Sequence, residues 1–312
     1  MSNLSPLEVS SARMDLYQAV RDYFSQSGAI EVEVPLLAAK TTTDPHINSF
    51  LVDGTSGLRY LQSSPEFFLK RLLSDNPQSI FTITKAFRDE EFGGNHNPEF
   101  SMLEWYRLDF KLADIIEDTL TLVRQYLGDL PLVRETYFSI FQRYLQLDPH
   151  QASLQDLQEL VVQHTNYGHD CVSVEEALQL LLTECIEPQF QPGITVLSEF
   201  PVSQAALSEV EPDANGRFVA KRFEIYLGKV ELANGYQELT DSLEQRSRFE
   251  RDNLIRQKLG RATQALDEAL LEAMDPSLPP CSGVSIGLDR LLMAKLDLEH
   301  IDSVLLFPWN KA

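Results

Sequence analysis

The sequence lacks the features of three classes of protein. No apolar run approaches the roughly 18 residues of a membrane span, and no basic start precedes an apolar stretch. The three cysteines have neither the spacing of a zinc site nor the even number of a disulfide framework. Basic residues are scarce, because 26 Lys and Arg face 47 Asp and Glu, and the net charge of −21 opposes broad attraction to nucleic acid. We therefore expect a cytoplasmic protein without membrane contact, in which any basic patch is local.

The sequence does contain enough hydrophobic residues for a large core. With 312 residues, 43% of them hydrophobic, the chain suits one large domain or two modest ones. Helical periodicity covers residues 154–162 and 173–186, and a strand follows at 194–197. We interpret residues 129–215 as a helical insertion that packs on a single domain spanning 1–312.

Several other segments carry the periodicity of helices and strands. An amphipathic helix is expected to begin at Ser10 or Ser11 and to end before Gly28, followed by a strand up to Pro35. A short strand, Leu58–Leu61, precedes Ser63–Glu66, which fits a helix-capping box. Further helices are expected at residues 112–127, 244–259 and 291–296.

The chemically richest stretch runs from Ile80 to Asp109 and predicts two strands joined by a loop. Ile80–Phe87 and Glu99–Leu108 are rich in β-branched and aromatic residues, and glycine, asparagine and proline interrupt the chain between them. This pattern places Arg88 and Glu90 beside the loop. A hairpin whose charges only face water would contain the same pair, so the pair alone does not distinguish a site from a surface.

The second of these strands has an unusual face. Alternation places Phe100, Met102, Glu104 and Tyr106 on the same side of the strand. A carboxylate and a phenol beside two apolar side chains suit a ligand pocket better than a dry core. The sequence therefore predicts that this side of the strand faces a ligand.

A second chemical segment runs from Arg217 to Asp241. Glu224, Glu231 and Glu238 are seven residues apart, a spacing that a solvated helix face would also give. Aromatic and β-branched residues favour strands here, and the glycines and Asn234 would interrupt a helix. The three carboxylates are therefore candidates for a site built on strands.

A third segment, Cys281–Arg290, predicts a strand of small residues that leads into a helix. A glycine beside a helix start is a common packing device, so this segment alone is weak evidence for a phosphate site. It gains weight only in combination with the two segments before it.

Taken together, these segments resemble the class II aminoacyl-tRNA synthetases. The letters RDE and HNPEFSMLEWY, within Ile80–Asp109, resemble motif 2 and are most similar to lysyl-tRNA synthetases. Met14–Pro35 resembles the dimer-forming motif 1, and Gly287–Arg290 resembles motif 3. The resemblance extends from about Ala12 to Leu306. It implies an α+β fold with a mostly antiparallel sheet flanked by helices, and a homodimer.

The resemblance also implies an ATP site. Arg88 would be the catalytic residue that stabilises the α-phosphate as a substrate carboxylate attacks it. Phe100 would stack on adenine, and Arg290 would bind the terminal phosphates. The full set implied for ATP is Arg88, Asp89, Glu90, Asn97, Phe100, Glu231, Leu232, Gly287 and Arg290.

A second set of residues would hold an amino-acid substrate with two amines. By the resemblance, Glu66 would lie near one substrate amine, and Glu238 with Tyr106 would bind the distal ammonium. Glu224 and Glu231 would hold Mg²⁺. The full set implied for the substrate is Ser64, Pro65, Glu66, Glu104, Tyr106, Asn234, Glu238 and Ser285.

Two departures from lysyl-tRNA synthetases narrow the expected reaction. Motif 1 begins within the first 30 residues, so no anticodon-binding domain is expected before it, and with the acidic charge this makes tRNA charging unexpected. Relatives of this architecture are ligases that adenylate (R)-β-lysine and transfer it to a lysine of elongation factor P. Ser285 stands where lysyl enzymes have glycine, which leaves the choice between β-lysine and lysine open.

Two alternatives stay open at the sequence level. One is a free-standing synthetase-like enzyme with another acceptor, and the other is a noncatalytic regulatory paralogue. The presence of Arg88, Glu90 and Arg290 opposes the noncatalytic alternative.

Overall fold

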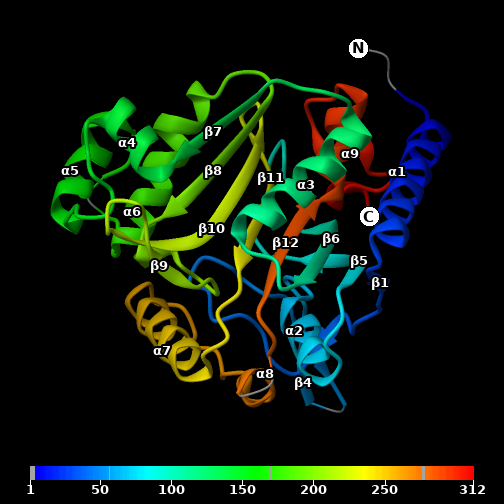
Figure 1. The fold of residues 1–312 in the computed structure, drawn as a ribbon, viewed down its shortest axis with the longest axis horizontal. Coiled ribbons are helices and arrows are strands. Elements are labelled where there is room, and N and C mark those ends of the chain that lie inside the picture. Colours follow the sequence, from blue (N-terminus) through cyan, green and yellow to red (C-terminus); the bar gives the residue numbers. More distant parts are fainter. Residues whose placement is uncertain (1–3, 56, 169, 276–277) are drawn as a thin grey trace.

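The computed structural model describes residues 4–55, 57–168, 170–275 and 278–312 (Figure 1). Their central feature is a nine-stranded sheet. It is antiparallel except that β1 pairs with β5, and β7 with β8, in parallel. Its strands in spatial order are β1 (Ile30–Glu31), β5 (Ile80–Phe87), β6 (Glu99–Leu108), β12 (Cys281–Gly287), β11 (Val230–Gln237), β10 (Phe218–Leu227), β8 (Ile194–Phe200) and β7 (Leu132–Thr136), with β9 (Val210–Pro212) beside β10.

Helices surround this sheet, which gives the α+β fold predicted from the sequence. Figure 1 shows α1 at one edge of the molecule, α4 to α6 at the opposite edge, and α2, α7 and α8 together below the sheet. The helices are α1 (Pro6–Ser27), α2 (Glu66–Asp75), α3 (Leu112–Leu127), α4 (Tyr137–Leu145), α5 (Leu154–His164), α6 (Val174–Leu181), α7 (Ser242–Lys258), α8 (Glu268–Met274) and α9 (Leu288–Leu296). Among the described residues, no helix has the length and apolarity needed to cross a bilayer.

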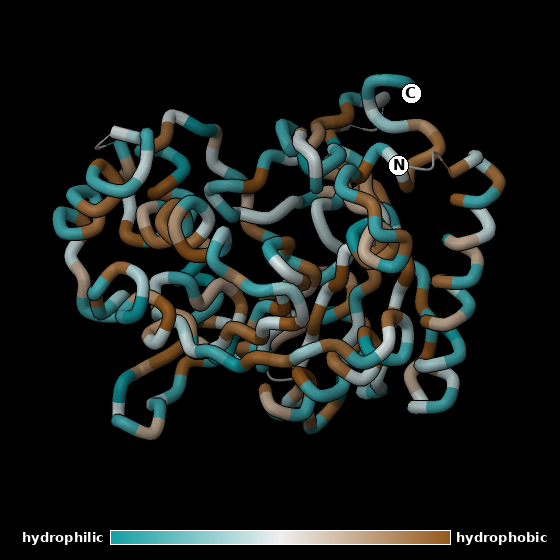
Figure 2. Tube along the Cα trace, turned by 90° about the horizontal axis from the view of Figure 1, so that it is seen from above, coloured by the Kyte–Doolittle hydropathy of each residue, from teal (hydrophilic) through white to brown (hydrophobic). Residues whose placement is uncertain are grey.

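The main core lies between the sheet and the helices α1, α3 and α9. Phe24 of α1 stacks on Phe81 of β5 with ring centroids 4.3 Å apart, and Trp105 of β6 meets Phe24 edge-on. In Figure 2 hydrophobic stretches run through the interior and hydrophilic ones follow the outer turns. This packing holds β5, β6 and β12 as a firm base for the loops at their ends.

The strands that carry the chemistry form where the sequence predicts them. β5 and β6 have the predicted bounds and pair in antiparallel register from Ile80 opposite Tyr106 to Phe87 opposite Glu99. β10 and β11 confirm that the segment with the three spaced glutamates is stranded. These pairings bring the ends of β6, β12 and β11 side by side.

Residues 129–215, where the sequence predicts a helical insertion, hold more than helices. The helices α4, α5 and α6 share a second core with Leu197 of β8 and Tyr226 of β10. The segment also supplies β7, β8 and β9 to the central sheet. Neither β7 nor α4 is predicted from the sequence, because Leu132–Thr136 has little alternation of its own and depends on β8 for its pairing.

Two predicted boundaries at the start of the chain are wrong. Helix α1 begins at Pro6 rather than near Ser10, and its cap is Ser5, whose hydroxyl and backbone exchange hydrogen bonds with Glu8. Its end at Gly28 is confirmed, since Gly28 adopts a left-handed φ of 75°. The strand after it is only Ile30–Glu31, because parallel pairing with β5 stops there.

The capping box predicted at Ser63–Glu66 is also wrong. Helix α2 begins at Glu66 with Pro65 as its N-cap, and the cap makes no side-chain hydrogen bond. The Glu66 carboxylate instead lies 2.8 Å from the ammonium of Lys70, one turn along the helix. A small sheet of β2 (Leu37–Ala38), β4 (Gly57–Leu61) and β3 (Leu51–Gly54) includes the short strand predicted at Leu58–Leu61.

One side chain joins the first helix to the last. Arg13 of α1 lies 2.6 Å from the carboxylate of Asp289 in the first turn of α9, and it donates to the carbonyl oxygen of Val304 at 2.7 Å. Asp289 also accepts from the backbone N–H of Ser101 at 2.6 Å. This buried carboxylate therefore fixes α1, β6 and α9 against one another.

Candidate active site

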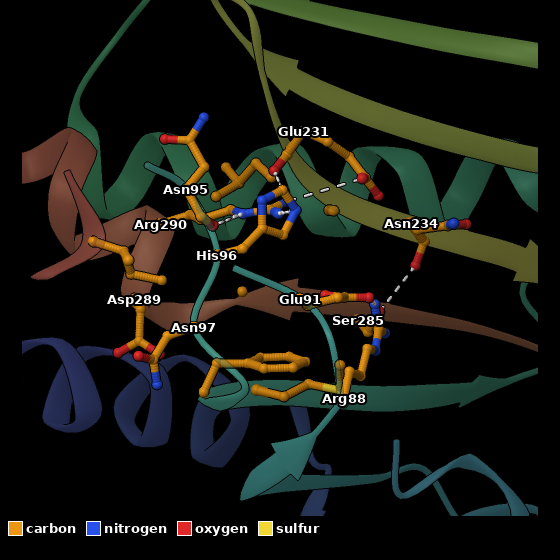
Figure 3. A pocket seen from close by; sticks show the side chains of 16 residues that line it. Arg88, Glu91, Asn95, His96, Asn97, Glu231, Asn234, Ser285, Asp289 and Arg290 are labelled. Atoms are coloured by element: carbon orange, nitrogen blue, oxygen red, sulfur yellow. Dashed lines mark hydrogen bonds and ion pairs between the residues drawn. The ribbon is translucent and has the colours of Figure 1, made fainter. Parts of the chain in front are cut away.

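The ends of β6, β11 and β12 and the start of α9 enclose a cavity of about 230 Å³ (Figure 3). Both charged and apolar side chains line it. They are Arg88, Glu91, Asn95, His96, Asn97, Phe100, Met102, Glu231, Leu232, Ala233, Asn234, Ser285, Gly287, Asp289, Arg290 and Ile301. The cavity thus brings together residues from three separate segments of the sequence.

Arg88 lies at one end of the cavity. Its guanidinium carbon is 5.2 Å from the ring centroid of Phe100, and its Nη1 is 3.5 Å from the carboxylate of Glu91. The backbone N–H of Arg88 donates to the carbonyl oxygen of Pro98 at 2.9 Å, which closes the loop between β5 and β6. Its Nε also lies 3.4 Å from the carbonyl oxygen of Ser63. Because its contacts with Glu91 and Ser63 are both long, the guanidinium stays free to bind an anion.

Arg290, in the first turn of α9, lies at the other side of the cavity beside His96 and Glu231 (Figure 3). It donates to the carbonyl oxygen of Glu231 at 2.7 Å and to that of Asn95 at 3.1 Å. Its Nη2 lies 2.7 Å from Nε2 of His96. Burial and the nearby Arg290 hold the pKa of His96 below its usual value, so the ring is neutral and accepts this hydrogen bond.

Two carboxylates meet at the pair of strands β10 and β11. Glu224 is buried and accepts from Arg222 at 2.6 Å and from the phenol of Tyr226 at 2.6 Å. Burial and the charge of Glu224 raise the pKa of Glu231 to about 6, and Glu231 faces the cavity. Tyr226 also donates to Glu187 at 3.1 Å, so a third carboxylate adjoins this pair.

Next to the cavity lies a buried cluster, which we call the amine pocket: Glu66, Lys70, Glu104, Tyr106 and Glu238. Lys70 bridges Glu66 and Glu238 at 2.8 and 2.6 Å. Tyr106 donates to Glu104 at 2.9 Å. Burial raises the pKa of Glu238 to about 7 and that of Glu104 well above its usual value. The cluster therefore has a carboxylate excess in a place that water barely reaches, which suits a cationic ligand.

Asn234 and Ser285 are directly opposite each other on β11 and β12, and both line the cavity. The Ser285 hydroxyl lies 3.5 Å from the carbonyl oxygen of Asn234. The side-chain oxygen of Asn234 is buried without a hydrogen-bond partner in the described chain. A buried acceptor of this kind is stabilised by a ligand that donates to it.

The sequence matches the family described as tRNA synthetases class II (D, K and N) over residues 3–311. The chain belongs to this family. It is also similar along nearly its whole length to curated proteins named elongation factor P–(R)-β-lysine ligase. The protein of Mannheimia succiniciproducens is 39% identical over 318 residues, covering 99% of this chain and 97% of its own. That of Proteus mirabilis is 40% identical over 304 residues, covering 94% of this chain and 92% of its own.

Half of the residues that the class II resemblance implies come together in the cavity. These are Arg88, Asn97, Phe100, Glu231, Leu232, Asn234, Ser285, Gly287 and Arg290. Glu66, Glu104, Tyr106 and Glu238 come together separately, in the amine pocket. The residues that the resemblance implies thus fall mainly into two groups, one around the two cavity arginines and one with an excess of carboxylates.

The remaining expected residues of the class II site lie outside the cavity lining. Glu90 is exposed, has a left-handed φ of 67° and accepts from the side-chain amide of Asn48. Asp89 donates its backbone N–H to the carbonyl oxygen of Asn48 at 2.8 Å. Pro65 is buried as the N-cap of α2, and Ser64 lines a second cavity of about 270 Å³.

Asn97 has a role that the sequence does not reveal. Its side chain donates to the carbonyl oxygen of Glu99 at 2.6 Å and accepts from the backbone N–H of Trp309 at 3.0 Å. The Trp309 ring in turn lies near Phe50 and Phe92. Asn97 therefore fastens the loop of the class II motif 2 to the C-terminal segment.

Sequence reasoning gave no role to four polar residues at the site: Lys70, Glu91, His96 and Asp289. The signal for Lys70 was its place four residues after Glu66, between two leucines that are fully buried in α2, Leu69 and Leu73. The others have no local signal, because their contacts with Arg88, Arg290 and Arg13 cross long distances in the sequence or depend on the conformation of the loop.

Proposed function

We propose that the protein activates (R)-β-lysine, or lysine, with ATP as an aminoacyl adenylate and transfers it to a lysine side chain of elongation factor P. One observation carries this proposal: a cavity flanked by two arginines adjoins a buried pocket of three carboxylates. The triphosphate of ATP needs positive partners, and a substrate with two ammonium groups needs negative ones. The arginines of the cavity and the carboxylates of the amine pocket supply these charges. The names of the relatives support the same reaction.

In the first step a substrate carboxylate oxygen attacks the α-phosphorus of ATP and pyrophosphate leaves. Arg88 lines the cavity with its guanidinium over the ring of Phe100, and its Nε lies 3.4 Å from the carbonyl oxygen of Ser63, shortly before the helix that carries Glu66. From there its guanidinium would stabilise the charge that develops on the α-phosphate. Arg290 would hold the terminal phosphates, with His96 fixing its direction.

Mg²⁺ fits Glu231 better than it fits Glu224. Glu231 faces the cavity and has a raised pKa, so a cation would relieve its repulsion with Glu224. Both oxygens of Glu224 already accept hydrogen bonds, and no cluster of three or more metal-binding side chains occurs in the described parts of the chain. Bound through these carboxylates and the phosphates, Mg²⁺ would neutralise phosphate charge.

In the second step the amine of the acceptor lysine attacks the carbonyl carbon of the adenylate. An amide bond forms, AMP leaves with the electron pair of the broken bond, and the amine loses a proton. Glu66, Glu238 and Asn234 would hold the substrate end during this step. We place the reaction in the cytoplasm, as the composition predicts.

The proposal is tested by measuring the mass of the acceptor protein after the reaction. The protein is incubated with ATP, Mg²⁺, one lysine isomer and purified elongation factor P, and the acceptor is analysed by mass spectrometry. We expect a mass gain of one lysyl group, faster with the β-isomer. Adenylate formation without any gain on elongation factor P would support a different acceptor instead, and absence of pyrophosphate release would support a noncatalytic protein.

We also propose a homodimer formed through α1 and the strand that follows it. Leu7, Met14 and Ile30 are exposed by 82%, 65% and 47%, although all three are large and apolar. Large apolar side chains left exposed along one helix and the strand after it suit an interface, and most homodimers are two-fold symmetric.

The expected result is a species of twice the 35.4 kDa chain mass in light scattering at micromolar concentration. Met14→Glu should shift the mass toward that of the monomer, whereas Leu254→Glu, at a site on α7 that is 58% exposed, serves as the control. A wild-type monomer with full activity would contradict the dimer.

A further inference from the structure

Lys70 is a lysine without any exposed surface in the middle of α2. Its ammonium lies 2.8 Å from Glu66 and 2.6 Å from Glu238. An ammonium buried without partners costs several kcal/mol, and these two carboxylates compensate it. The chain therefore places a cation of its own inside the pocket that is proposed to receive the cations of the substrate.

The amine pocket contains a third carboxylate, on Glu104. The charges of Glu66 and Glu238 raise its pKa further, and that of Lys70 lowers it, so all four groups act on one another. A bound cation favours the ionised form of all three carboxylates, and in that state the pocket carries three negative charges and one positive charge. The remainder is two negative charges, which matches a substrate with two ammonium groups.

The other titratable groups that face this cluster add no charge. Tyr106 on β6, Tyr236 on β11 and Cys281 on β12 all have pKa values raised by burial, so they are neutral near pH 7. Arg222, which faces Tyr236, is paired with Glu224 at 2.6 Å. Among the described groups that face this pocket, Lys70 is therefore the cation that compensates the charge of its carboxylates.

We propose that Lys70 is a positioning residue of the amine pocket: its ammonium joins Glu66 to Glu238 and leaves two net negative charges for a substrate with two ammonium groups. This inference rests on the proposed function. Glu66 is one turn away on the same helix, whereas Glu238 follows β11, so the bridge also fixes α2 against the sheet.

The role follows from repulsion between like charges. Without Lys70, three carboxylates would share one buried pocket, and each would favour the protonated form of its neighbours. A protonated carboxyl cannot form an ion pair with an ammonium. The substrate would then have to displace a proton in order to bind. The rise of substrate affinity with pH would therefore occur at higher pH than in the wild type.

The test measures the affinity of (R)-β-lysine and L-lysine by calorimetry between about pH 6 and 9, the range in which a carboxyl with a strongly raised pKa titrates. For the wild type we expect affinity to fall as the pH drops through about 7, where Glu238 takes up a proton. In Lys70→Met this midpoint should move up by at least about one pH unit, which makes binding at pH 7 at least about fivefold weaker, because the wild-type carboxyl is already half protonated there. Lys70→Arg, which keeps the charge, should hold the midpoint near that of the wild type.

Two further variants separate charge from packing. Lys85→Met changes a lysine paired with Glu99 at 3.4 Å outside the amine pocket, and it should leave the midpoint in place. Lys70→Met combined with Glu66→Gln removes one charge of each sign and should return the midpoint toward that of the wild type, even where overall affinity falls. ATP affinity is measured in parallel and should change little.

The outcomes distinguish this inference from the function on which it rests. An unmoved midpoint in Lys70→Met, or an equal loss at every pH in Lys70→Met and Lys70→Arg, would show a purely structural lysine and overturn the inference while the function stands. A folded wild-type protein that binds neither lysine isomer would overturn the proposed function itself.

Discussion

Replacing Arg88 with alanine should slow adenylate formation by about 10²- to 10³-fold, the loss typical of removing one group that stabilises transition-state charge. The fold should remain, because the guanidinium has long contacts with Glu91 and Ser63 and lies at the cavity rather than in the core. ATP-dependent pyrophosphate exchange with saturating amino acid measures the effect. Thermal unfolding measured on the same samples reports whether the variant stays folded.

The matched control is Arg134→Ala. Arg134 lies on β7, away from the cavity, and is exposed in an ion pair with Glu117. An exposed pair contributes less than about 1 kcal/mol to stability, so both folding and exchange should be close to those of the wild type. A folded Arg88→Ala protein with near-normal exchange would remove Arg88 from the reaction.

Glu238→Gln should weaken binding of the lysine isomers by about 2 to 5 kcal/mol, the range for breaking a buried charge pair. Glutamine keeps the shape and hydrogen bonding of the side chain but cannot compensate a cation. The substitution also leaves Lys70 with one carboxylate instead of two, which repels an incoming ammonium. Calorimetry with each isomer and with ATP distinguishes an effect on the amine pocket from one on the cavity.

ATP affinity is the internal reference for this variant, because Glu238 does not line the cavity proposed to hold ATP. Glu268→Gln is the matched control, since Glu268 is an exposed carboxylate paired with Arg246 on the surface. Equal losses for ATP and lysine would make Glu238 part of a metal site. Unchanged binding of both ligands would place it outside the site.

The strands and helices with strong local patterns could be predicted from the sequence. Ile80–Phe87, Glu99–Leu108 and Leu112–Leu127 have their predicted bounds because hydrophobic periodicity, glycine and proline all indicate the same ends. β7 could not be predicted, since its pairing with β8 bridges residues about 60 apart and leaves no local pattern. The cap of α2 was predicted wrongly because Lys70 competes for Glu66.

The site residues, like the strands and helices, could be predicted from the sequence only in part. The resemblance to the class II motifs was enough to propose Arg88, Arg290 and Glu238, and the structure places two of them in one cavity and the third in the pocket beside it. Spacing could not show that Glu90 turns toward Asn48 or that Glu224 already has two partners. Such facts depend on which side chains meet in space, and the order of residues along one strand does not encode them.

Through the contact of Arg13 with Asp289, a dimer formed by α1 would couple protein concentration to catalysis. Arg13 belongs to α1, whose outer side is the proposed dimer surface, and Asp289 precedes Arg290 at the cavity proposed to hold ATP. If pairing of two copies steadies α1, it also steadies the helix that presents Arg290. Reciprocity then requires ATP to tighten the dimer by the same factor by which the dimer tightens ATP. Dilution would thus lower the activity of this enzyme slightly, and added nucleotide would restore it.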